Sequence, residues 1–281
     1  MITVAEYQEG MELTEGYFSG VPNEIYHAHN SISKSGLDLI DRDPYHFFSQ
    51  KPREQTRPMQ VGSAIHAAIL EPEVFASEYM MLPTLKDRRQ PEYRQAVKAY
   101  GEGKVFTNAD CENIDNIQKA VWSNTEAAEL LNADGWCELS GFVKDPVSGV
   151  MCRHRFDKLT KDGWAVDVKK TQDVRSEEFA KSIYNYRYHV QDAFYLAQYE
   201  WLTGQQLKGM KFICVEEKWP HKVAIYQLCD ISREIGANLF RYNLDTYAYH
   251  RNNDLLPTND TTTEIISLPE WVMRRYEDEL V

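Results

Sequence analysis

The chain has 281 residues, 43% of them hydrophobic and 26% charged, and its formal net charge is −12. No apolar run approaches the ~20 residues that span a bilayer, and the first residues do not resemble a signal peptide, so we expect neither a membrane protein nor a secreted one. The five cysteines form no C-x-x-C pair. We therefore expect reduced thiols in a cytoplasmic protein and not a disulfide-rich one. A protein with this negative net charge does not attract DNA through its overall charge. Either nucleic acid is not its ligand, or the nucleic acid binds in a local basic groove.

The N-terminal part of the chain is predicted to contain two helices. Residues 1–30 show little periodicity and are expected to be irregular with one short strand. Ser33 is a favourable N-cap for a helix that runs to about Asp41. Residues 45–60 indicate a loop, and a small apolar helix is predicted over residues 62–70.

Two features of these helices allow either a functional or a structural interpretation. At the first helix start, Ser33-Lys34-Ser35 presents free backbone N–H groups that can bind an anion such as phosphate. Simple capping is the commoner use of such residues. His66 lies between Ile65 and Ile69, so on the residues alone it is a core histidine and not a ligand.

The next segment is predicted to be a charged loop followed by a helix. Residues 75–104 are charged and contain two prolines, and they indicate either a mobile basic loop that contacts DNA or a plain solvated segment. Apolar residues at helical spacing, among them Ile114, Ile117 and Val121, predict a long amphipathic helix over residues 108–131.

Three strands joined by tight turns are predicted over residues 136–144, 150–160 and 164–170. The loop Lys161-Asp162-Gly163 has glycine where a three-residue hairpin needs a positive φ, so residue numbers paired across this hairpin are expected to sum to 324. A four-residue loop over 146–149 makes paired numbers across the other hairpin sum to 295.

These registers bring charged side chains together. Asp157 falls opposite Asp167 and Arg155 opposite Lys169, while the other hairpin places Glu138 opposite Asp157. Because side chains alternate along a strand, Asp157, Asp167 and Lys169 are expected to share one face. Carboxylates placed in this way repel one another, and Mg²⁺ or Mn²⁺ would relieve the repulsion. From the spacing alone, a solvated face with a Lys–Asp pair is favoured over a metal site.

The remaining elements complete a predicted α+β fold. We expect a single domain over residues 1–281, with a central mixed sheet of about five strands flanked by helices. Gln191 and Tyr195 are four residues apart and share a helix face, where packing in a tyrosine-rich stripe is their simplest role. The other predicted elements are helices from Ser176, over 189–202 and from Ser232 to about Tyr249, strands over 210–215 and 223–228, an exposed loop over 252–263 and a helical turn over 269–276.

Six segments in chain order carry a family resemblance: 31–40 (SISKSGLDLI), 62–72 (GSAIH through LEP), 145–158 (DP, CR and DK), 167–171 (DVKKT), 184–195 (YNYRYHVQDAFY) and 267–271 (SLPEW). Together they resemble the motifs of the RecE-type exonucleases, the exodeoxyribonuclease VIII family of the PD-(D/E)XK nuclease superfamily, which is related to λ exonuclease. The resemblance covers most of the chain, and it implies the α/β-type core of that superfamily.

The resemblance also implies roles for individual residues. It implies that Lys169 orients the attacking water, and that the catalytic set is Lys169, Asp157, Asp167, Gln191 and Tyr195. It implies one or two Mg²⁺ or Mn²⁺ ions per site, held by Asp157, Asp167, the carbonyl of Val168, His66 and Glu138. Contacts to DNA and its 5′-phosphate are expected from Ser33, Lys34, Ser35, Arg155 and Gln191.

The implied activity is a Mg²⁺-dependent 5′→3′ exonuclease on linear double-stranded DNA, which leaves a 3′ overhang for recombination by strand annealing. The implied partners are double-stranded DNA ends, a RecT-type annealing protein and copies of the chain itself in a ring, a trimer or tetramer, with no membrane. Two alternatives remain open: a site-specific or single-strand endonuclease on the same fold, and a catalytically silent module that binds DNA ends.

Overall fold

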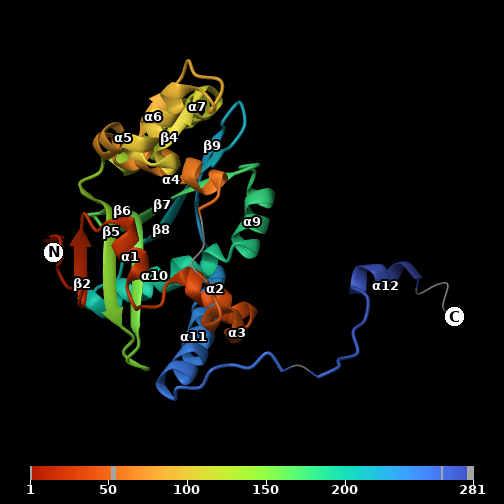
Figure 1. The fold of residues 1–281 in the computed structure, drawn as a ribbon. Helices are drawn as coiled ribbons and strands as arrows, with labels where there is room; N and C mark the ends of the chain where they lie inside the picture. Colours follow the sequence, from red (N-terminus) through yellow and green to blue (C-terminus); the bar gives the residue numbers. More distant parts are fainter. Residues whose placement is uncertain (1, 52–54, 261, 277–281) are drawn as a thin grey trace.

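The computed structural model describes residues 2–51, 55–260 and 262–276, so residues 52–54 and 261 of two predicted loops lie outside the described residues. A mixed sheet runs through the centre of the fold (Figure 1). Its strand order is β1-β2-β5-β6-β7-β8-β9, in which β1–β2 and β7–β8 are parallel and the other neighbours antiparallel. The strands are β1 (Val4–Glu6), β2 (Gly16–Ser19), β5 (Gly135–Lys144), β6 (Met151–Thr160), β7 (Trp164–Thr171), β8 (Gly209–Glu216) and β9 (Val223–Gln227).

The predicted α+β class and the mixed sheet are confirmed, but the expected number of about five strands is too small. Strands β1 and β2 come from residues 1–30, which were expected to be irregular with one short strand. They are short, and β2 becomes a strand by pairing with the edge of β5, where Gly16 lies opposite Phe142. A second sheet of two parallel strands, β3 (Met80–Leu82) and β4 (Val105–Thr107), lies outside the central one.

Both predicted hairpin registers are confirmed. Strand β5 pairs with β6 from Gly135↔Thr160 to Lys144↔Met151, which fits a sum of 295. Strand β6 pairs with β7 at Lys158↔Val166 and Leu159↔Ala165, which fits a sum of 324. The turns have the expected geometry, because Gly163 has φ +96° and Gly149 has φ +73°.

The β6–β7 ladder nevertheless ends after two residue pairs. The predicted pairings of Asp157 with Asp167 and of Arg155 with Lys169 are therefore not formed, although the register is right. Phe156 and Leu159, three residues apart, belong to the same core cluster, so the strict alternation of faces is interrupted at Asp157. The two strands separate at the point where the carboxylates lie.

Helices cover both faces of the central sheet. One face packs on helices α4, α7 and α8 through Val166, Val168, Ile213 and Val215. The other packs on α9 and α10 through residues such as Phe212 and Cys214, and α10 in turn packs on α2 and α11. These helices are α2 (Lys34–Arg42), α4 (Arg57–Leu70), α7 (Asn108–Ser123), α8 (Thr125–Asn132), α9 (Ser176–Asn185), α10 (Tyr188–Thr203) and α11 (Asp230–Asn252).

Several predicted loops contain regular structure. The segment 45–60 holds α3 (Pro44–Phe48) and the first turn of α4, and the segment 75–104 holds β3 and α6 (Pro91–Tyr100), following α5 (Pro72–Glu78). Of the two interpretations of residues 75–104, the loop is wrong, because these elements form the lobe above the sheet in Figure 1. Contact of this segment with DNA stays a prediction. The long helix predicted over 108–131 breaks at Asn124, whose side chain caps α8 by accepting a hydrogen bond from the Ala127 amide.

The other predicted elements agree with the structure. Helix α10 ends at Gly204, which is left-handed (φ +65°), and α11 begins two residues before the predicted Ser232. The cysteines are all free, and Cys111, Cys152 and Cys214 are buried. No described helix is long and apolar enough to cross a membrane.

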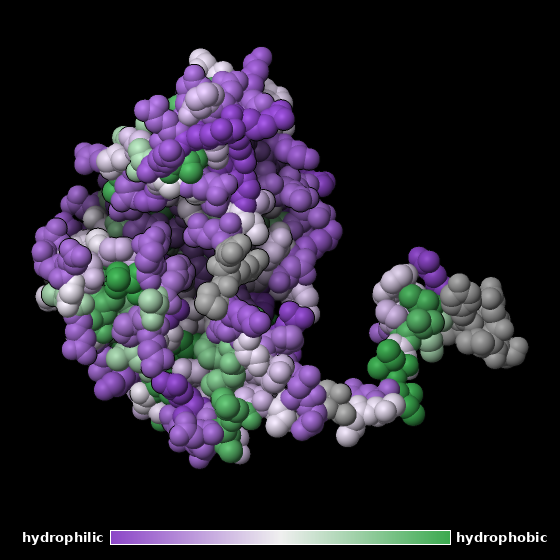
Figure 2. Space-filling view, in the orientation of Figure 1, coloured by the Kyte–Doolittle hydropathy of each residue, from purple (hydrophilic) through white to green (hydrophobic). Residues whose placement is uncertain are grey.

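The C-terminal segment leaves the body and ends in α12 (Glu270–Tyr276) (Figure 1). Figure 2 shows hydrophobic residues gathered on this segment, while the body is mainly hydrophilic in the same view. Large exposed apolar side chains here include Ile265, Ile266, Leu268 and Trp271.

Gly236 marks the closest approach of α10 and α11. A Cβ atom at this position would lie 2.0 Å from the carbonyl oxygen of His189. We expect Gly236→Ala to destabilise the protein by about 1–3 kcal/mol or more, because the backbones must move apart. Gly62→Ala in α4 meets no atom within 4 Å and should stabilise by about 0.5–1 kcal/mol. Urea unfolding measures both, and equal unfolding free energies for the two variants would contradict this packing.

Candidate active site

Three side chains of the kinds that can ligate a metal, from three elements, converge at the sheet. His66 of α4, Glu138 of β5 and Asp157 of β6 offer ligand atoms that all lie within 4.8 Å of one another. The imidazole Nδ1 of His66 is 3.4 Å from Oδ2 of Asp157. The sequence predicted these three residues as ligands, and the structure brings them together. We call them the metal cluster.

Asp157 lies where β6 and β7 separate. Its Oδ2 accepts a hydrogen bond from the amide of Val168 at 2.7 Å. Without this bond, the end of the ladder would leave that buried amide unpaired, which is costly. The carboxylate therefore takes the place of a missing ladder acceptor. Val168 contributes its amide to this contact, and the predicted role of its carbonyl as a metal ligand stays a prediction.

Glu138 occupies an unusual backbone conformation. Its φ is +48°, in the left-handed region, and the β5–β6 pairing includes its neighbours Cys137 and Leu139 but not Glu138 itself. A non-glycine residue in this region costs on the order of 1–3 kcal/mol, and such residues concentrate at functional sites. The predicted pairing of Glu138 with Asp157 is thus replaced by a local distortion that brings its carboxylate to the cluster.

The carboxylates of the metal cluster hold protons more tightly than usual. Burial and, after it, the nearby Asp167 carboxylate raise the pKa of Asp157 to about 6, against the opposing effects of His66 and Lys169. Burial, followed by the charge of Asp157, raises the pKa of Glu138 to about 8. Both raised pKa values show that nearby positive charges do not balance the negative charge of these two carboxylates. A divalent cation would supply the missing positive charge.

Asp167, Lys169 and Gln191 form a closed network next to the metal cluster. The ammonium Nζ of Lys169 lies 2.6 Å from Oδ2 of Asp167 and donates to Oε1 of Gln191 at 3.0 Å. The Gln191 amide in turn donates to Oδ1 of Asp167. Oδ1 of Asp167 thus accepts a hydrogen bond, whereas its buried Oδ2 is ion-paired with Lys169 but accepts no hydrogen bond within the described residues. Asp167 is not one of the three clustered ligands. Its direct contact with a metal stays a prediction.

The Lys169 side chain is positively charged at neutral pH. Burial lowers the pKa of its ammonium, but Asp167, Tyr188 and Asp157 outweigh that effect and raise the pKa overall. The ammonium also lies 4.5 Å from the centre of the Tyr188 ring, a cation–π contact. A charged lysine held by three partners can orient a water molecule or stabilise negative charge that develops on a phosphate.

Tyr195 supports the site by packing, the simplest of its expected roles. Its ring packs against Phe156 and His154, with centroids 5.7 Å and 5.5 Å away, and a catalytic part for Tyr195 stays a prediction. Burial raises its pKa well above the ordinary value, so the phenol stays neutral. Tyr195 thus holds β6 against α10 behind the metal cluster.

The predicted anion site at the start of α2 lies on the Lys169 side of the centre. The Ser33 hydroxyl caps the helix by accepting from the Gly36 amide and hydrogen-bonds to Ser35. Lys34 pairs with Asp38 at 2.7 Å and donates to the carbonyl of Tyr186. Burial lowers the pKa of Lys34, and the positive charges of Lys169 and Arg187 lower it further. Phosphate binding here stays a prediction, but the helix start is close enough to Lys169 for the two ammonium charges to interact.

Arg155 makes contacts within the protein. Its guanidinium donates to the Ser140 hydroxyl, the Val21 carbonyl and the Asn23 side chain, and it lies over the ring of Tyr26. These contacts fasten the N-terminal segment to the sheet. The predicted contact of Arg155 with phosphate stays a prediction.

Three further residues, Tyr186, Arg187 and Tyr188, lie beside Lys169 and were not among the predicted site residues. The signal available was their position in the segment 184–195, which carries the family resemblance. Glu71 also lies near the cluster, and its negative charge therefore helps to raise the pKa of Glu138. Burial raises the pKa of Glu71 as well.

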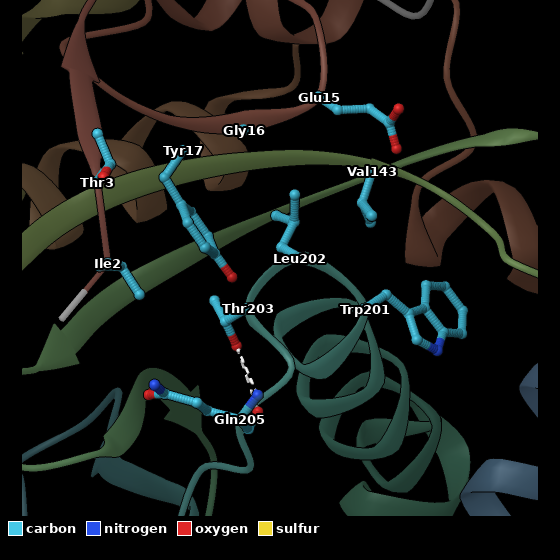
Figure 3. A pocket seen from close by; sticks show the side chains of 10 residues that line it. All are labelled: Ile2, Thr3, Glu15, Gly16, Tyr17, Val143, Trp201, Leu202, Thr203 and Gln205. Carbon is cyan, nitrogen blue, oxygen red and sulfur yellow. Dashed lines mark hydrogen bonds between the residues drawn. The ribbon is translucent and has the colours of Figure 1, made fainter.

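A cavity of about 560 Å³ lies elsewhere. It is lined by ten residues, none of them histidine, cysteine or lysine. Figure 3 shows it between β2 and the end of α10, with Tyr17 and Trp201 among its walls. Its single carboxylate, Glu15, accepts a hydrogen bond from the Lys144 amide. This cavity has none of the paired acidic and basic groups of the metal cluster.

Comparisons with known proteins agree with the fold. A family described as "PDDEXK-like domain of unknown function" matches residues 46–268. A crystal structure named "Putative exonuclease" from Eubacterium rectale superposes with a TM-score of 0.61 at 12% identity, over 95% of this chain and 99% of that one, and it shows the same fold. A structure of SSO0001 has a TM-score of 0.29 at 13% identity, over 76% and 85% of the two chains, and this score is too low to indicate a shared fold. No curated protein matches the chain.

Proposed function

The chain belongs to the PDDEXK-like domain family, and from this premise we propose that it is a divalent-metal-dependent nuclease that hydrolyses phosphodiester bonds of DNA. One observation carries the proposal. The His66–Glu138–Asp157 cluster adjoins the Asp167–Lys169–Gln191 network, so a candidate metal site and a candidate catalytic lysine lie side by side. Nucleases of this superfamily generally use divalent metals.

The residues present fit a hard divalent cation such as Mg²⁺ or Mn²⁺, one or two per site. Two carboxylates with raised pKa values and one imidazole provide oxygen and nitrogen donors. When bound, such an ion acts as a Lewis acid and lowers the pKa of its water. In this mechanism His66, Glu138 and Asp157 would hold it, and Asp167 would add a ligand if Lys169 or Gln191 released one oxygen.

The chain's own residues would orient the reaction. Lys169 holds the attacking water at its ammonium and offsets the negative charge of the phosphate during displacement. Gln191 keeps that ammonium in place by accepting its hydrogen bond. Ser33, Lys34 and Ser35 bind the 5′-phosphate of the strand end through the hydroxyl and ammonium donors at the start of α2.

The polarity, the substrate and the product of the proposed activity rest on the resemblance to RecE-type exonucleases. We propose 5′→3′ digestion of one strand of linear double-stranded DNA, which leaves a 3′ overhang for a RecT-type annealing protein. A homo-oligomeric ring, a trimer or tetramer, would enclose the duplex. Such a ring would explain how a chain of net charge −12 stays on DNA, since topology replaces charge attraction. Light scattering tests the ring, and a monomer at working concentration would disprove it.

Digestion of end-labelled DNA tests the activity and its polarity. A linear duplex with 5′-phosphates is labelled at either the 5′ or the 3′ end and incubated with Mg²⁺ or EDTA. Early release of the 5′ label in Mg²⁺ alone is expected. Cleavage of covalently closed circular DNA would instead identify an endonuclease. Binding of ends without cleavage in any condition would identify a silent binding module.

Lys34 supplies a sharper test of the 5′-phosphate site. Lys34→Met should lower the rate on 5′-phosphorylated ends by about tenfold, since a charge-assisted contact to phosphate is lost. The rate on 5′-hydroxyl ends should change little. Lys181→Met is the matched control, because Lys181 is exposed and pairs only with Glu178 among the described charges. A loss of rate that is equal on both kinds of end would refute the assignment.

A further inference from the structure

An exposed tyrosine stands beside the catalytic lysine. Tyr186 is 61% exposed, and its ring stacks on that of Tyr188 at a centroid distance of 5.6 Å and an interplanar angle of 27°. Tyr188 stacks in turn on buried Phe212 at 6.0 Å and 26°. The three rings form a column from the protein core to solvent. Its outer end is an aromatic surface that is largely open to solvent.

The backbone holds this ring in place. Arg187 follows Tyr186 and has φ +53°, in the left-handed region. Its guanidinium lies 3.1 Å from both Asp38 and Asp41 of α2 and donates to Asn243 of α11 at 2.6 Å. The carbonyl of Tyr186 accepts a hydrogen bond from Lys34. A strained conformation persists only when its surroundings fix it, and here α2 and α11 do so.

The column lies against the catalytic groups. The Lys169 ammonium is 4.5 Å from the centre of the Tyr188 ring, so Tyr186 is one ring away from the catalytic lysine. Lys34 connects the same tyrosine to the proposed phosphate site. Cations next to an open aromatic face are the combination that binds a nucleotide of a single strand, since the phosphate meets charge and the base meets a ring.

We propose that Tyr186 stacks on the base of the terminal nucleotide of the strand being cut, once that base has left its pairing partner. This inference rests on the proposed nuclease function and adds a specificity-determining residue to it. Stacking tolerates every base, since each has a π-face. A paired terminal base must first separate, so the enzyme should prefer ends whose last nucleotides are unpaired.

Equilibrium binding tests the stacking without requiring hydrolysis. The probe is a duplex whose unpaired 5′-terminal base is 2-aminopurine, bound to the full chain in EDTA so that no strand is cut. We expect stacking on Tyr186 to quench its fluorescence. Tyr186→Ala should abolish the quenching and weaken binding by about tenfold. Tyr186→Phe should keep both, and so should Tyr184→Ala, an exposed tyrosine outside the column.

A second readout comes from cleavage. Wild-type protein should cut ends with unpaired terminal bases faster than fully paired ends, and Tyr186→Ala should lose this preference. If Tyr186→Ala proves unstable, Tyr186→Leu keeps an apolar cover on Tyr188 and should show the same loss. Quenching that is unchanged in the alanine and leucine variants would overturn the inference. Quenching by a wild type that never cleaves DNA would support the stacking and refute the nuclease activity.

Discussion

Replacing Asp157 with asparagine should reduce DNA hydrolysis by about a thousandfold or more while making the metal-free protein more stable. The loss of rate follows because a ligand charge of the metal cluster disappears, and bound metal supplies several kcal/mol of the catalysis. Asparagine is the sharper replacement, since its amide oxygen can still accept the Val168 hydrogen bond that Asp157 accepts now. The measurement is initial rate in Mg²⁺ together with urea unfolding in EDTA.

The gain in stability has a definite pH dependence. Folding raises the pKa of Asp157 from 3.8 to about 6, so between these values the native state binds more protons than the unfolded state. The free energy of unfolding of the wild type therefore falls as pH rises through this window. Each unit of pKa difference corresponds to about 1.4 kcal/mol. The asparagine variant lacks this fall, so its advantage should be absent below pH 3.8 and complete above pH 6.

Asp145 provides a matched control with the opposite sign. Its carboxylate is also buried, but Arg241 binds both of its oxygens, at 2.8 Å and 3.0 Å. Although burial alone would raise the pKa of Asp145, hydrogen bonds from Arg241 and Ser148 lower it overall. Asp145→Asn should therefore destabilise the protein at neutral pH and leave hydrolysis by the folded fraction unchanged. Equal stability changes in Asp145→Asn and Asp157→Asn would contradict the charge assignment of the metal cluster.

Addition of Mg²⁺ or Mn²⁺ should stabilise the protein strongly and increasingly as pH rises. A ligand at a hundred times its dissociation constant adds about 2.7 kcal/mol to the free energy of unfolding. Because Asp157 and Glu138 must lose protons to bind metal, and their pKa values are about 6 and about 8, affinity should rise between pH 5.5 and pH 8.

Thermal unfolding with metal or with EDTA at these two pH values checks this prediction. Asp157→Asn should abolish the metal-dependent shift, and Asp162→Asn, in an exposed turn where Lys208 pairs with Asp162, should keep it. A shift of the same size at both pH values would show that the raised-pKa carboxylates are not the ligands. A shift that survives Asp157→Asn would place the metal elsewhere.

The turns explain why the registers of the central strands could be predicted from sequence. Gly163 fixes a three-residue loop and residues 146–149 a four-residue one, and both are local choices of the backbone. The edge strands could not be predicted in this way, since β2 depends on pairing with β5, more than a hundred residues away. The same holds for residues 75–104, whose helices bury little apolar surface of their own; of α6 only Tyr93 is buried.

The site was predictable in its residues but not in its detailed geometry. Asp157, Lys169 and His66 could be named because their segments resemble the RecE-type motifs, whereas spacing alone favoured a core histidine and a solvated Lys–Asp pair. The separation of β6 from β7, which turns Asp157 toward the Val168 amide, is a tertiary event. The left-handed conformation of Glu138 is another, since nothing in the residue type favours it.

The three residues of the metal cluster come from two layers of the fold, the helices and the sheet. His66 belongs to α4, in the helical layer, whereas Glu138 and Asp157 belong to the sheet. An ion that binds all three would act as a reversible cross-link between parts of the chain that are distant in sequence. A disulfide persists in the unfolded chain and restricts it, whereas this ion would stabilise the folded state by binding it and would form and release with ion concentration and pH. The helical layer and the sheet would then be fastened together most firmly under the conditions in which the enzyme is active.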